Sequence, residues 1–201
     1  MILKTRNLVL VHGLWDTPQV FSGLTNRLCS DDLVVFAPHL PHHGGKLPLM
    51  TLAHDLDRLI IQRFGGKSQV EILGFSMGGL IARAWLQNLG GFLRASDFIS
   101  VGSPHRGTFT AQLVPSFLFP GIADMKRDSD FISELNQSSH LLEGIKCRSY
   151  FCRWDLMACP GWEAVLPNGS HNLLPVLTHK DLISNPDSLR ILAKDILIGR
   201  H

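Results

Sequence analysis

A single serine lies between glycines in the segment GFSMG at residues 74–78. An apolar run over 69–75 precedes Ser76 and a helical pattern follows it, so the segment fits the G-x-S-x-G turn between a strand and a helix. In such a tight turn, a Cβ two positions before or after the serine would collide with backbone, and glycine removes the collision. The spacing therefore predicts that the Ser76 hydroxyl is a nucleophile. A serine that only caps a helix is the alternative interpretation.

A serine hydroxyl is a weak nucleophile and needs a base, which in turn needs an acid to orient it. In a fold of alternating strands and helices, the acid and the base follow the serine in chain order, each after a later strand. Asp155 comes just after the apolar run at 146–154, and His179 comes just after the run at 170–177. Because parallel strands end at one edge of a sheet, both side chains are expected beside Ser76. We therefore predict Asp155 as the acid and His179 as the base.

The other candidates fit this order less well. His105 follows a predicted strand but precedes the acid position, and His171 lies at the beginning of the last predicted strand, at the opposite edge. Asp181 shares a loop with His179, and three further acids lie inside an irregular stretch. The remaining histidines fall in the first strand, in the loop after the second strand, in helical patterns or at the chain end: His12, His39, His42, His43, His54, His140 and His201. A metal cluster in the loop after the second strand stays open as a minor alternative.

Two backbone N–H groups are expected to hold a developing oxyanion. The N–H of Met77 lies at the start of the helix that follows the serine, where the helix dipole favours negative charge. The second donor of such sites comes from the loop after the first strand. That loop begins His12-Gly13-Leu14, so we predict the N–H of Leu14. A plain turn at Gly13 is the alternative.

Apolar runs alternate with helical patterns along the chain, which is typical of a parallel sheet covered by helices. Strands are predicted at 7–13, 32–38, 69–75, 96–103, 146–154 and 170–177. Helices are predicted at 18–30, 51–64, 77–90, 128–137 and 186–199, with Thr51 as the N-cap of the second. The pattern predicts one α/β domain over residues 1–201 with about six mostly parallel strands.

The stretch 104–145 is longer than a usual connection between a strand and its helix. It combines phenylalanine, leucine and proline, and it precedes the acid-bearing strand. Two interpretations are open: a lid or acyl-chain pocket, and a segment that simply packs on the core.

Composition excludes several classes of protein. Hydrophobic residues make up 45% and charged residues 18%, which argues against disorder, and the net charge of +2 argues against a nucleic-acid partner. The N-terminus reads as a strand rather than a signal peptide, and no apolar run is long enough to cross a membrane. The cysteines lack metal-ligand spacing, which predicts reduced thiols: Cys29, Cys147, Cys152 and Cys159. We therefore expect a cytoplasmic monomer, and an exported protein is the alternative.

The chain resembles the lipase and esterase branch of the α/β-hydrolase superfamily, most closely compact bacterial triacylglycerol lipases. The matching segments are LVLVHGLW, GFSMGGLIAR, VGSPHRGT, FCRWDLM and LTHKDLI. The resemblance implies an α/β-hydrolase fold and hydrolysis of lipid or acyl esters without a metal or another cofactor. Phe75 stands where the branch usually has histidine, which is not a position of the catalytic triad.

Three other functions stay open beside ester hydrolysis. The same triad could act as an acyltransferase or thioesterase, because acyl transfer differs from hydrolysis mainly in how the site admits water. The chain could also be a catalytically silent binding scaffold, although such a scaffold needs none of Ser76, Asp155 and His179. Transient contact of the apolar insertion with a membrane surface is compatible with either.

Overall fold

The computed structural model describes residues 5–158 and 161–198. Within them, six strands form one sheet in the order β2-β1-β3-β4-β5-β6, and every neighbouring pair is parallel. The strands are β1 Arg6–Val11, β2 Leu33–Phe36, β3 Val70–Phe75, β4 Ala95–Val101, β5 Lys146–Phe151 and β6 Ser170–Leu173. This sheet confirms the α/β-hydrolase fold expected from the sequence.

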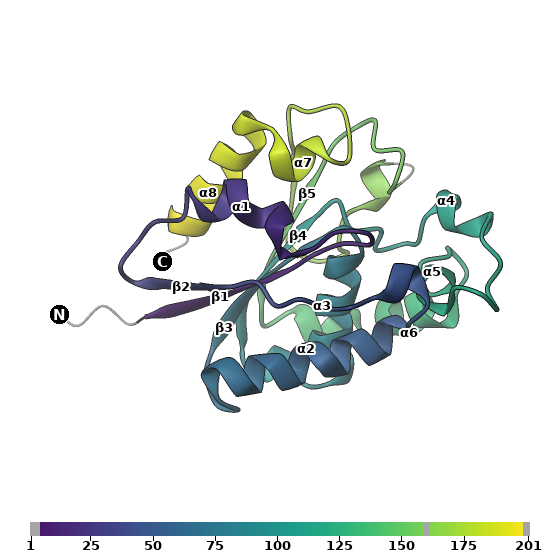
Figure 1. Cartoon of the computed structure of the whole chain (residues 1–201), viewed down its shortest axis with the longest axis horizontal. Helices are drawn as coiled ribbons and strands as arrows, with labels where there is room; N and C mark the ends of the chain where they lie inside the picture. Colours follow the sequence, from purple (N-terminus) through teal and green to yellow (C-terminus); the bar gives the residue numbers. More distant parts are fainter. Residues whose placement is uncertain (1–4, 159–160, 199–201) are drawn as a thin grey trace.

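Helices cover both faces of the sheet, as Figure 1 shows. One face carries α2 Leu49–Phe64, α3 Met77–Asn88 and α6 Asp130–Gln137, and the other carries α1 Ser22–Thr25, α7 Asp181–Ser184 and α8 Pro186–Ile198. Each layer of helices closes its own hydrophobic core against the sheet. Strand β3 lies at the centre and is buried at every position, which fits its largely apolar sequence. Its one charged residue, Glu71, is paired with Arg6.

Short elements complete the described chain. Two are α-helical, α4 Phe109–Gln112 and α5 Pro120–Ala123. Five are 3₁₀ turns: η1 Pro18–Phe21, η2 His43–Gly45, η3 Gly91–Leu93, η4 Ser139–Leu142 and η5 Gly161–Glu163. No helix in the described part of the chain is long and apolar enough to cross a membrane.

Two helices differ from the sequence prediction. The segment predicted as one helix over 18–30 is a 3₁₀ turn followed by α1, which ends at Thr25. Helix α2 begins at Leu49, so the prediction of Thr51 as its N-cap is wrong. Its first N–H, on Leu49, donates to the side-chain oxygen Oδ2 of Asp124 at 2.7 Å. Asp124, a residue distant in sequence, therefore caps the N-terminus of α2.

The insertion over 104–145 has two parts of different character. Its second half is core, because Ile132, Leu135 and Leu142 are buried in the same cluster as α2 and α3. Its tip is not, because the side chains of Leu113 and Phe117 are 90% and 84% exposed. The insertion lies at the end of the molecule where the strands finish (Figure 1), and it therefore both completes the core and borders the site described next.

Candidate active site

Ser76 lies in the sharp turn between β3 and α3, with backbone angles φ 55° and ψ −128°. Positive φ is uncommon for a residue other than glycine and marks local strain. The turn is fixed from both sides, since the N–H of Ser76 donates to the Val101 carbonyl at 2.9 Å and its carbonyl accepts from Gly79 N–H at 3.0 Å. The strand and helix therefore present the serine side chain at the carboxyl edge of the sheet.

The glycines around Ser76 are required by close approach of backbone. A Cβ on Gly78 would lie 2.0 Å from the Val11 carbonyl oxygen, and one on Gly74 would lie 2.4 Å from the Cα of Gly79. Real Cβ atoms essentially never come under 3.0 Å. The collision expected from the G-x-S-x-G spacing is thus present on both sides of the serine.

Asp155 and His179 are in contact. Nδ1 of His179 lies 2.7 Å from Oδ2 of the Asp155 carboxylate, which is buried. The other carboxylate oxygen, Oδ1, accepts from the N–H groups of Met157 and Ala158, each at 2.9 Å. These bonds hold the carboxylate in one orientation, and it in turn orients the imidazole.

The His179 ring also has close contacts with two other residues. The Phe75 ring stacks on it with centroids 5.0 Å apart, and Gly102 lies so close that a Cβ there would be 3.1 Å from the imidazole Cε1. Nε2 of His179 is buried and has no hydrogen-bond partner among the described residues. That nitrogen is therefore available to accept a proton, and it is not bonded to Ser76 in this structure.

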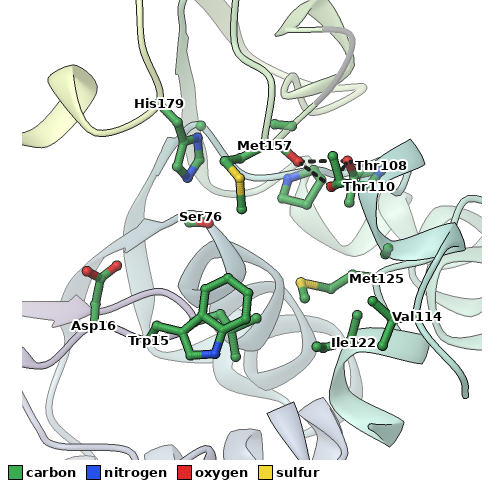
Figure 2. Close-up of a pocket in the computed structure, with 15 residues that line it drawn as sticks. Trp15, Asp16, Ser76, Thr108, Thr110, Val114, Ile122, Met125, Met157 and His179 are labelled. Atoms are coloured by element: carbon green, nitrogen blue, oxygen red, sulfur yellow. Dashed lines mark hydrogen bonds between the residues drawn. The ribbon is translucent and has the colours of Figure 1, made fainter. Parts of the chain in front are cut away.

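Ser76 and His179 line a common cavity of about 130 Å³. Figure 2 shows Ser76 between two different walls. On one side lie the apolar side chains of Val114, Ile122 and Met125, and on the other lies Asp16. The insertion thus supplies the apolar wall. The hydroxyls of Thr108 and Thr110 bind the Met157 carbonyl at 2.7 and 3.2 Å, which ties that wall to the loop of Asp155.

The predicted oxyanion donors lie on the two segments that meet at Ser76. A Cβ on Gly13 would be 2.9 Å from the Cβ of Ser76, so the loop after β1 passes directly over the serine, and Leu14 lines the cavity. Met77 is the first residue of α3, where N–H groups have no partner within the helix. Both predicted donors therefore belong to segments that meet beside Ser76.

Two histidines support the loop that carries Leu14. His12 is buried and bridges two loops, with Nδ1 3.1 Å from the Gly13 carbonyl and Nε2 accepting from Leu40 N–H at 3.1 Å. Burial lowers its pKa, which keeps the ring neutral, as an acceptor must be. Trp15 has φ 62°, and its N–H lies 3.1 Å from Nε2 of His42. Sequence reasoning assigned neither His42 nor Trp15 to the site.

Asp16 is the other site residue that the sequence analysis missed. It is half-buried in the cavity wall, and burial raises the pKa of its carboxyl group, whereas the nearby His179, Lys180 and His42 lower it. A signal was present in the sequence, because Asp16 follows β1 at the same sheet edge as the other site residues.

His105 and His171, two other histidines considered as the base, lie outside the cavity. His105 is fully buried with Nε2 2.6 Å from Oγ of Ser100, and His171 lies in β6 with Nε2 2.9 Å from the Leu166 carbonyl. Neither lines the cavity. No group of three or more histidine, cysteine or acidic side chains among the described residues could hold a metal ion. Cys159, one of the thiols predicted to be reduced, lies outside the described residues.

Comparison with known proteins agrees with this fold. The model of a family described as "Alpha/beta hydrolase family" matches residues 8–151. No curated protein sequence matches the chain significantly.

Several solved structures share the fold at low sequence identity. Lipase B of Aspergillus fumigatus superposes with a TM-score of 0.77 at 19% identity, over 96% of this chain and 52% of the fungal one. This chain therefore spans about half the length of that lipase. The mature lipase BlEst2 of Bacillus licheniformis gives 0.73 at 16% identity, over 98% of this chain and 93% of that one. The RedJ thioesterase of Streptomyces coelicolor gives 0.61 at 20% identity, over 95% and 89%.

Proposed function

Since this chain belongs to the alpha/beta hydrolase family, we propose that it is a serine hydrolase that cleaves carboxylic esters through a covalent acyl-enzyme. The observation that carries the proposal is the meeting of three features in one cavity. These are the strained turn that exposes Ser76, the Asp155–His179 pair, and an Nε2 on His179 with no partner among the described residues. A binding scaffold would need none of them.

The reaction follows from the roles of these groups. Oγ of Ser76 forms a bond to the ester carbonyl carbon while its proton passes to Nε2 of His179. The N–H groups of Met77 and Leu14 stabilise the oxyanion. The tetrahedral intermediate then breaks the bond to the alcohol oxygen, which takes the proton from His179. Water, deprotonated by His179, attacks the acyl-enzyme and releases the acid, and Ser76 regains its proton.

The first test is the intact mass of the protein after exposure to a fluorophosphonate. Wild type should gain one label per chain, and Ser76→Ala should gain none. Loss of Ser76 should also lower kcat for p-nitrophenyl butyrate by a factor on the order of 10⁶. A folded wild-type protein that stays unlabelled, or a Ser76→Ala variant with wild-type ester hydrolysis, would contradict the proposal.

A further inference from the structure

Asp16 is a charged side chain in the cavity wall to which the proposed mechanism gives no role. It lies very close to the nucleophile. The point where a Cβ on Gly13 would lie is 3.0 Å from Oδ2 of Asp16 and 2.9 Å from the Cβ of Ser76. A carboxylate oxygen is therefore within reach of a small group attached to an ester bound at Ser76.

The position of Asp16 indicates which half of a bound ester it would contact. Ile122, Met125 and Val114 form the opposite wall of the cavity (Figure 2). An acyl chain is stabilised against apolar side chains and would lose that stabilisation beside a carboxylate. With the acyl chain against the apolar wall, the alcohol half of the ester faces Asp16.

The carboxylate of Asp16 can accept a hydrogen bond from a ligand. Its side chain forms no hydrogen bond with another described residue. A half-buried acceptor without a partner costs free energy that a donor on the substrate would recover. Among the groups that act on this carboxylate, Lys180 is a cation at neutral pH. Lys180 would repel an ammonium group, so the fitting donor is a neutral hydroxyl.

We propose that Asp16 makes the enzyme selective for esters whose alcohol carries a second, free hydroxyl group, which donates a hydrogen bond to the Asp16 carboxylate. The substrate class is thus a monoester of a polyol. This inference rests on the proposed ester hydrolysis and adds the alcohol half of its substrate.

The test is a competition between two esters with the same acyl group, glycerol 1-monobutyrate and propyl butyrate, mixed at equal concentration. The initial ratio of glycerol to propanol released gives the ratio of the two kcat/KM values, whatever the amount of active enzyme. Wild type should favour the glycerol ester by about tenfold, the factor expected for one hydrogen bond to a charged group that is partly solvated. Asp16→Ala and Asp16→Leu should bring the ratio close to one, and Asp16→Asn should keep part of the preference because its amide oxygen still accepts.

Val114→Ala is the matched control, because it alters the opposite wall and should change both rates by the same factor. A wild-type ratio near one, or an Asp16→Ala variant that slows both esters equally, would overturn the assignment. So would a wild-type preference for butyrylcholine that Asp16→Ala removes, since that would mean recognition of an ammonium group. If wild type neither reacts with the fluorophosphonate nor hydrolyses either ester, the proposed function itself fails. Labelling of Ser76 without any preference between the esters rejects only the role of Asp16.

Discussion

The bond between Asp155 and His179 determines which nitrogen of the imidazole can accept a proton. With Nδ1 donating to the carboxylate at 2.7 Å, Nε2 is the basic nitrogen. The carboxylate cannot turn away, because its other oxygen is held by two backbone N–H groups. In the proposed mechanism, Asp155 therefore acts through the tautomer and orientation of His179, and this role can be tested separately from that of the serine.

Asp155→Asn should lower kcat for p-nitrophenyl butyrate by up to about 10⁴-fold while the protein stays folded. The amide oxygen of asparagine can keep the bonds to Met157 and Ala158, which leaves its NH₂ group facing His179. The imidazole must then accept at Nδ1 and carry its proton on Nε2, where it can no longer take one from Ser76. Steady-state kinetics and circular dichroism check both parts of the expectation.

Asp181→Asn is the matched control for that variant. Asp181 is the first residue of α7, two positions after His179, and its carboxylate accepts from the Thr178 hydroxyl at 2.7 Å rather than from the imidazole. Its replacement should leave kcat within a few-fold of wild type. A loss of less than tenfold in Asp155→Asn would show that another group orients His179.

At the scale of the elements, the site depends on how closely α3 approaches β1. Gly78 touches the Val11 carbonyl so tightly that the helix could not keep its place with any side chain there. That contact brings the start of α3, and with it the Met77 N–H, beside the loop that carries Leu14. The same glycine therefore contributes to stability and to the geometry of the proposed oxyanion site.

Gly78→Ala should lower the free energy of unfolding by about 3 kcal/mol or prevent folding, because an added methyl group in a packed interior forces backbone to move. The control is Gly144→Ala, where a Cβ would meet nothing within 4 Å. That change should alter the free energy of unfolding by less than about 1 kcal/mol. Urea unfolding of both variants measures the difference, and equal stabilities would refute the close packing of α3 on β1.

The sequence predicts the elements and the chain order of the site well, and the contacts between distant segments poorly. All six strands overlap the segments predicted as strands, although β6 is polar and ends at Leu173 instead of 177. Asp155 and His179 could be chosen because parallel strands end at one edge. Asp124 as the cap of α2 could not be predicted, since the bond joins residues that no local pattern relates. Asp16 was missed because the loop after β1 was considered only for its backbone donor.

At the scale of the whole molecule, the insertion belongs to the fold as much as to the site. Arg83 of α3 is fully buried and donates to the carbonyls of His105 and Leu135, at 3.3 and 2.8 Å, so it joins the start and the middle of the insertion to the core. Burial lowers the pKa of Arg83 to about 10, which still leaves it charged at neutral pH. A lid function could therefore involve only the exposed tip around Leu113 and Phe117.

His105, which is buried near this charge, is one of the groups through which pH acts on the stability of the fold. His105 is fully buried, its Nδ1 has no partner among the described residues, and burial together with the charge of Arg83 lowers its pKa well below the usual value. As the pH falls below about 6.5, the unfolded chain binds a proton at this position and the folded chain does not. The contribution of His105 to the free energy of unfolding is therefore complete above about pH 6.5 and is lost as the pH falls.

Between pH 7.5 and pH 5.5, the share of His105 in this loss is about 1 kcal/mol, the order expected for one histidine that is neutral when folded and titrates normally when unfolded. The lowered pKa values of His12 and His42 act in the same direction, and the raised pKa values of Asp16 and Asp124 act in the opposite one. These groups are present both in wild type and in His105→Gln, so their contributions cancel in the comparison. Glutamine at position 105 can keep the bond to Ser100 but does not titrate. Urea unfolding at both pH values should thus show a free energy of unfolding that falls by about 1 kcal/mol more in wild type than in the variant. Equal falls in the two proteins would mean that His105 can take up a proton in the folded state, and that the core around Arg83 admits water.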